Sequence, residues 1–156
     1  MALMQSLNLP PFDFKLGTLD GKTTIFDPIR KKYLVLTPEE WVRQHIVNFL
    51  TVELQYPRSL IKLEGQLHYN QMPRRSDVVT FNRSGNPHML VECKAPGVKI
   101  SQKVFDQAAT YNAILKAKFL VVTNGLKHYC CEIDHERAAF IFLEAIPSFE
   151  DIASIQ

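Results

Sequence analysis

The sequence predicts an α/β (α+β) fold, in which a central mixed β-sheet is flanked by helices. Two amphipathic helix patterns, at residues 37–55 and 101–116, are separated by short strand-like segments. Turn signals divide these segments, and further strands follow the second helix. The resulting order, β-α-β-β-β-α-β-β, is typical of helices packed on a mixed sheet.

Length and composition predict one soluble globular domain. The chain has 156 residues, of which 46% are hydrophobic and 22% charged. Without a Gly/Ser linker, we expect residues 1–156 to form a single domain with a β-rich extension at about 1–36. No apolar run is long enough to span a bilayer and no secretory signal is visible, so we expect a cytoplasmic protein with no membrane partner.

The first helix has a well-defined start. The run before it contains a tight turn at Leu19-Asp20-Gly21-Lys22 between two strands. Thr37 is the expected N-cap, Pro38 suits the first helical position, and Glu40 can complete a capping box. The helix should continue to about Gln55.

The remaining elements form the expected sheet and its second helix. Ser101 should cap a helix that ends near Lys116, and Asn124-Gly125 should end the apolar strand before it. The predicted strands are Leu60–Tyr69, Ser76–Phe81, His88–Cys93, Phe119–Thr123, Leu126–Ile133 and Ala138–Ile146.

Cysteine and histidine spacing argues against zinc and disulfides. The chain has three cysteines, no C-x-x-C pair, and five histidines without metal-ligand spacing. Cys130 and Cys131 are therefore interpreted as core residues rather than as redox centres.

Charged residues within predicted core strands indicate a functional site. Glu92 and Lys94 share one face of an apolar strand, whereas Cys93 points to the other. A hairpin centred between Ser84 and Gly85 would place Asp77 directly opposite Glu92. Two adjacent carboxylates repel unless a cation lies between them, which predicts a site for Mg²⁺ or Mn²⁺. Metal-dependent cleavage of a phosphodiester would use such a site. Lys94 would then orient or deprotonate the attacking water, or stabilise charge on the phosphate.

The local charge distribution is compatible with a DNA partner. Between residues 58 and 103, the basic side chains outnumber the acidic ones, although the net charge of the chain is only +2. A basic face would suit a phosphate backbone, and an ordinary solvated face is the equal alternative. Arg74 and Arg75 could contact phosphate or could protect a strand edge.

The site residues, taken together, resemble a known nuclease core. Asp77 with Glu92-Cys93-Lys94 is similar to the PD-(D/E)xK motif, with Ser76 in place of the proline. Gln107 and Tyr111 match the Q-x-x-x-Y signature that some branches carry on the following helix. With the runs at 26–30 and 37–44, residues 26–134 resemble the N-terminal endonuclease domain of type I restriction enzyme R subunits (HsdR).

This resemblance implies a role for each matching residue. Asp77, Glu92 and the backbone carbonyl of Cys93 would hold the metal, and Lys94 would be the catalytic lysine. Auxiliary or DNA-positioning roles would fall to side chains outside this core. These are Gln107, Tyr111, Arg75 and an acid of the first helix, Glu40 or Glu39, although the capping box is an alternative role for Glu40.

The implied function is Mg²⁺-dependent endonuclease activity on DNA. The chain would then be a hydrolase of a restriction-modification system. The alternative is a non-catalytic DNA-binding or subunit-interaction module that keeps the nuclease fold. The sequence contains no G-x-x-x-x-G-K-[ST] P-loop. We therefore expect no ATP-driven translocation by this chain alone, and a separate helicase, motor or specificity subunit is a further expected partner.

Overall fold

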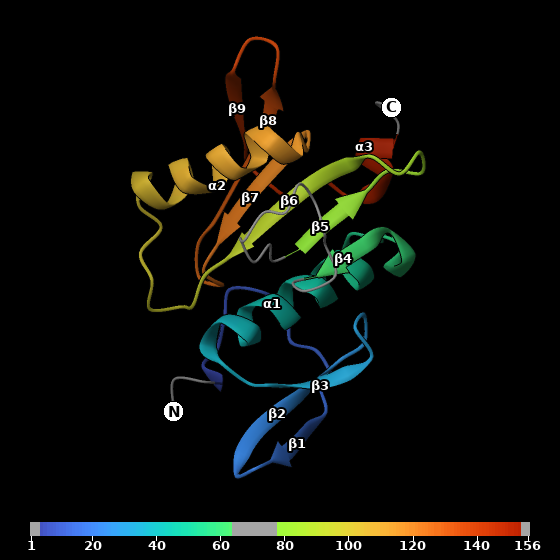
Figure 1. Ribbon diagram of the computed structural model, residues 1–156, viewed down its shortest axis with the longest axis vertical. Coiled ribbons are helices and arrows are strands. Elements are labelled where there is room, and N and C mark those ends of the chain that lie inside the picture. The colour runs from blue at the N-terminus through green and yellow to red at the C-terminus, as the bar shows by residue number, and fades with distance from the viewer. Residues whose placement is uncertain (1–3, 64–77, 154–156) are drawn as a thin grey trace.

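A six-stranded mixed sheet forms the centre of the protein (Figure 1). The computed structural model describes residues 4–63 and 78–153. The strands lie in the order β4-β5-β6-β7-β8-β9, and β6 and β7 are parallel while the other pairs are antiparallel. Their bounds are β4 Ile61–Leu63, β5 Val78–Phe81, β6 Pro87–Cys93, β7 Phe119–Thr123, β8 His128–Asp134 and β9 Ala139–Leu143. The predicted fold class is confirmed.

The two long helices cover opposite faces of this sheet. Helix α1 (Pro38–Asn48) packs through Val42 and Ile46 into one buried cluster, which includes Met89, Val91 and Cys93 of β6. Helix α2 (Gln102–Leu115) packs into a second cluster, which contains Leu90 and Leu120. The alternation of side chains along β6 therefore divides the core into two layers.

Helix α1 begins as the sequence predicts and ends differently. The Thr37 hydroxyl accepts a hydrogen bond from the Glu40 amide at 3.0 Å, and Pro38 occupies the first turn. The α-helix ends at Asn48 and continues as a π-helical segment, η2 (Phe49–Glu53). The predicted end near Gln55 therefore holds for the helical path as a whole, but not for its α-helical part.

The Thr37 cap makes a measurable contribution to stability. We expect Thr37→Ala to lower the free energy of unfolding by about 1 kcal/mol, because the Glu40 amide loses its acceptor. Urea titration followed by circular dichroism would measure the loss. Thr37→Ser, which keeps the hydroxyl, should remain near wild type, and equal losses in both variants would contradict the capping role.

A second, smaller sheet precedes α1. It consists of β1 (Leu16–Leu19), β2 (Lys22–Asp27) and β3 (Lys32–Val35), which are antiparallel in that order. The predicted turn after Leu19 is present, and both of its central residues have positive φ, 51° at Asp20 and 76° at Gly21.

The β5–β6 hairpin has the register that the predicted site requires. Val78 pairs with Val91 and Val79 with Leu90, and a bulge at Thr80/Phe81 adjusts the pairing next to the turn. The Asn82 side chain closes the turn by accepting hydrogen bonds from the amides of Ser84 and Asn86. Asp77, whose predicted position is opposite Glu92, lies outside the described residues.

The N-terminal segment ties α1 to the β7–β8 turn. The Trp41 indole donates to the Gln5 carbonyl at 2.9 Å, and the Asn8 amide donates to the Gly125 carbonyl at 2.8 Å. Gly125 has φ +85°, and a Cβ there would lie 3.0 Å from the Leu7 side chain. A short helix, α3 (Phe149–Ala153), follows β9, and none of the described helices is long and apolar enough to cross a membrane.

Candidate active site

The carboxyl end of the central strand β6 carries a partly buried ion pair. The Nζ atom of Lys94 lies 3.3 Å from Oε2 of Glu92. The Glu92 side chain is 4% exposed, whereas that of Lys94 is 26% exposed. The predicted placement of these two residues on one face is confirmed. The Lys94 side chain contacts the buried carboxylate and is itself partly exposed to solvent.

This pair lies on the same side of the sheet as α2. Val91 and Cys93 belong to the cluster under α1 and Leu90 to the cluster under α2, so the alternation of β6 places Glu92 on the α2 side. Tyr111 is buried in that same cluster. Gln107, one turn earlier on α2, is exposed. One member of the predicted auxiliary pair is thus part of the core and the other faces solvent.

Two residues that the sequence analysis did not select hold the Lys94 backbone and the loop after it. The Lys94 amide donates to the Thr123 carbonyl at 2.8 Å, which extends the parallel β6–β7 pairing by one residue. The Asn124 side chain donates to the Val98 carbonyl at 2.8 Å and accepts from the amides at 126 and 127. The Asn-Gly pair after an apolar strand was the sequence signal, and it predicted only a turn.

Glu40 is the centre of a buried charge network at the start of α1. Its Oε1 accepts from Arg43 at 2.5 Å, and its Oε2 accepts from Arg30 at 2.9 Å and from Gln44 at 2.8 Å. Arg30 also bonds Asp27, the last residue of β2, so the network links the small sheet to α1.

The predicted capping box is wrong in its second half. Thr37 caps the helix through its own hydroxyl. Both carboxylate oxygens of Glu40, however, accept hydrogen bonds from the side chains of Arg30, Arg43 and Gln44. The sequence could not reveal this competition, because Arg30 comes from a different element. The auxiliary role of Glu40 in a nuclease site stays a prediction.

The second predicted carboxylate ligand falls outside the described residues. Asp77 and Arg75 both lie there, as does Arg74. Within residues 4–63 and 78–153, no three His, Cys, Asp or Glu side chains are grouped so that they could hold a metal ion. From this part of the chain, Glu92 supplies the carboxylate oxygens that suit a hard cation such as Mg²⁺.

Among the described basic side chains, those of Arg83 and Lys94 lie at opposite ends of β6. Arg83 lies in the β5–β6 turn and its guanidinium carbon is 5.0 Å from the centre of the Phe149 ring. Lys94 follows the other end of β6, a seven-residue strand, and the two ends are about 20 Å apart. The positive charge in contact with Glu92 therefore comes from Lys94, and Arg83 lies at the far end of the strand.

The adjacent free cysteines of β8, Cys130 and Cys131, are core residues, as predicted. Burial, with a smaller contribution from Cys131, raises the pKa of Cys130 to about 12. Burial also raises the pKa of Cys131 to about 11. Both thiols stay protonated at neutral pH, so neither is a reactive thiolate.

Comparison with known families assigns the chain to one of them. Residues 38–147 match the family model described as the type I restriction enzyme R protein N terminus (HSDR_N). The chain belongs to this family. The match begins at the first residue of α1 and continues beyond β9, so it includes all of β6, α2 and β7.

A solved structure supports the fold of this R-protein N-terminal domain. It is described as a fragment of an HsdR subunit of a type I restriction enzyme from Vibrio vulnificus YJ016, with a TM-score of 0.52 and 22% identity. The similarity covers 76% of this chain and 25% of that one, so the chain spans about a quarter of its relative. A search of the curated proteins found no match.

Proposed function

We propose that this protein is a Mg²⁺-dependent endonuclease that hydrolyses phosphodiester bonds in DNA. The observation that carries the proposal is the buried Glu92–Lys94 pair at the carboxyl end of β6, in a chain of the R-protein N-terminal family. A buried carboxylate and a half-buried lysine require a reason, and metal-assisted phosphate chemistry supplies one.

The proposed metal ligands are Glu92, Asp77 and the backbone carbonyl of Cys93. All three present hard oxygen donors, which suit Mg²⁺ or Mn²⁺ better than zinc. The pairing of Val78 with Val91 has the same register as the predicted hairpin, in which Asp77 lies opposite Glu92. When bound, the ion would polarise the phosphate and lower the pKa of water.

Lys94 is proposed to act on the phosphate or on the attacking water. Its ammonium lies 3.3 Å from Glu92, and its side chain reaches solvent. A cation fixed in a partly water-excluded site stabilises negative charge that develops on a phosphate. The hydrogen bond from the Lys94 amide to Thr123 holds the backbone from which that side chain extends.

The helices supply the proposed auxiliary residues. Gln107 is exposed on α2 and could contact DNA, while Tyr111, one turn later, anchors the helix in the core. Because the similar HsdR fragment is about four times as long as the matched part, we propose that a motor or specificity subunit delivers the DNA to this domain. Restriction-modification is the corresponding biological role.

Cation binding tests the proposed site separately from catalysis. We expect Mn²⁺ or Mg²⁺ to bind the wild-type protein in calorimetry, and Glu92→Gln and Asp77→Ala to weaken that binding by about tenfold or more. Both variants should also lose cleavage of linear, circular and single-stranded DNA. Glu132→Gln is the matched control, because Glu132 forms a more exposed Glu–Lys pair with Lys118 at 3.7 Å on the same sheet.

The alternative function predicts a different pattern of results. A non-catalytic DNA-binding or subunit-interaction module would retain DNA without a divalent cation and would cleave none of the substrates. Unchanged cation affinity in Glu92→Gln and Asp77→Ala would refute the metal site, whatever the activity of the preparation.

A further inference from the structure

The edge strand β9 exposes aromatic and aliphatic side chains on both of its faces. Phe140, Ile141 and Phe142 are 43%, 58% and 61% exposed. The strand Ala139–Leu143 contains no charged residue, and within the part of the chain that the structure describes it pairs with β8 alone. In Figure 1 the β8–β9 hairpin projects beyond the rest of the sheet. Apolar edges of this kind pair with another strand unless they are protected by charge or proline.

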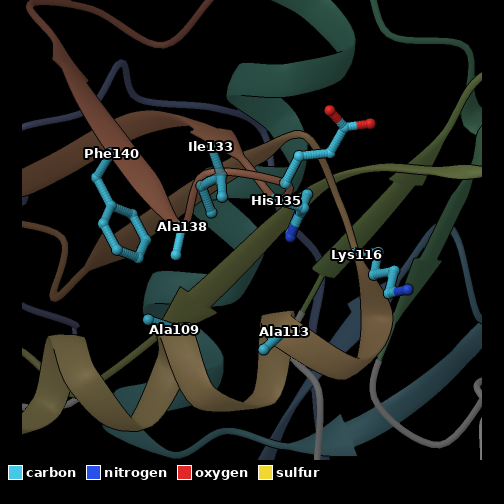
Figure 2. Close-up of a pocket in the computed structure, with 8 residues that line it drawn as sticks. Ala109, Ala113, Lys116, Ile133, His135, Ala138 and Phe140 are labelled. Carbon is cyan, nitrogen blue, oxygen red and sulfur yellow. The ribbon is translucent and has the colours of Figure 1, made fainter.

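The apolar surface continues from β9 onto α2. The Phe105 ring lies 5.9 Å from that of Phe140 and 5.5 Å from that of Phe142, which places both phenylalanines on the α2 side. Phe140 also lines a cavity of about 290 Å³ (Figure 2). Ala109 and Ala113 of α2 form its opposite wall. The α2 side of β9 is therefore a wide apolar surface rather than a single exposed side chain.

The sequence of β9 is complementary to itself. When two copies of a strand join antiparallel in one continuous sheet, a two-fold axis perpendicular to the sheet relates them, and the same face stays upward in both. Because directly opposed residues point to the same face of the sheet, one residue of the strand must lie opposite its own copy. If Ile141 faces Ile141, Phe140 of each copy lies opposite Phe142 of the other, with Cβ atoms about 4.5–5.5 Å apart.

The charges beyond the strand fit the same arrangement. Continuing the pairing one step past the apolar segment brings Glu144 of one copy opposite Ala138 and next to Arg137 of the other. Glu144 is exposed, and the Arg137 side chain is 86% exposed, with a loose contact to Asp134 at 3.8 Å. Opposite charges thus meet at both ends of the paired strands, related by the two-fold axis.

We propose that β9 is a homodimer interface, at which two copies of this chain join their six-stranded sheets edge to edge through Ile141. The contact is isologous and uses the free edge of β9 in each copy, so association through it stops at two. This inference is independent of the proposed nuclease chemistry, because none of its residues is among the proposed site residues.

Oligomeric state as a function of concentration is the first test. We expect sedimentation of the full chain to show a monomer–dimer equilibrium without larger species. Ile141→Lys should raise the dimer Kd by about tenfold or more, because it places two ammonium groups directly opposite each other. Leu19→Lys is the matched control, since Leu19 is 60% exposed on the edge strand β1.

Position-specific cross-linking tests the register. Ile141→Cys should form an intermolecular disulfide under mild oxidation, because opposed Cα atoms lie within the bonding range. Leu19→Cys should not, and the native thiols Cys93, Cys130 and Cys131 are all buried. A wild-type chain that is monomeric at every concentration, or equal cross-linking at positions 19 and 141, would overturn the proposal. So would a β9 edge that becomes protected only when a different protein is added.

Discussion

Replacing Lys94 with methionine is expected to reduce DNA cleavage by about 10²–10³-fold while divalent-cation binding persists. The substitution keeps an unbranched side chain, shorter by one atom, and removes the charge that lies 3.3 Å from Glu92. Losing one preorganised group that stabilises transition-state charge typically has an effect of this size. Single-turnover cleavage, with calorimetry of Mn²⁺ binding on the same preparations, would measure both quantities.

The matched control for Lys94→Met is Lys22→Met. Lys22 is an exposed lysine at the start of β2, in the smaller sheet, so the change in net charge is the same. Lys22→Met should cleave at the wild-type rate. If Lys94→Met also did so, Lys94 would have no catalytic role, and the buried pair would have to be explained as a structural ion pair.

The second large effect is on stability, at Glu40. We expect Glu40→Ala to lower the free energy of unfolding by about 3–5 kcal/mol, because it removes a carboxylate shared by two buried guanidinium groups. The side chains of Arg30, Glu40 and Arg43 are 8%, 7% and 3% exposed, respectively. Denaturant unfolding would measure this loss, provided that the variant is compared at the same ionic strength.

Glu39 provides the internal control for this experiment. It lies on the same helix, and its carboxylate also bonds Arg43, at 2.8 Å, but its side chain is 42% exposed. Exposed ion pairs contribute little, so Glu39→Ala should change stability by less than about 1 kcal/mol. Similar losses at positions 39 and 40 would contradict the buried network as the cause. Cleavage by a folded Glu40→Gln protein would test the predicted auxiliary role separately.

Local signals predicted much of the fold. Helix α2 begins directly after its predicted cap, Ser101, and β7 has the predicted bounds. The turn chemistry around Gly85 was sufficient to predict how β5 and β6 pair, despite the bulge. These features depend on residues close together in the chain, where capping, turn preference and alternation act directly.

Features that depend on distant contacts were missed. The π-helical segment after Asn48 and the shared use of Glu40 by Arg30 and Arg43 have no local sequence signature. The short helix α3 has one, the capping pair Ser148 and Asp151, which the sequence analysis overlooked. At the candidate site, the Glu92–Lys94 contact followed from strand alternation, but the hydrogen bond from Lys94 to Thr123 required the parallel crossover. Roles for Asp77 and Arg75 rest on the sequence alone.

The contact between the N-terminal segment and the β7–β8 turn has a consequence for biosynthesis. Asn8 leaves the ribosome long before Gly125, yet its amide binds the Gly125 carbonyl. The parallel pairing of β6 with β7 likewise waits for the whole of α2 to be made. Contacts that join such distant parts of a chain form late and slowly. Most of the chain must therefore be synthesised before this domain can close.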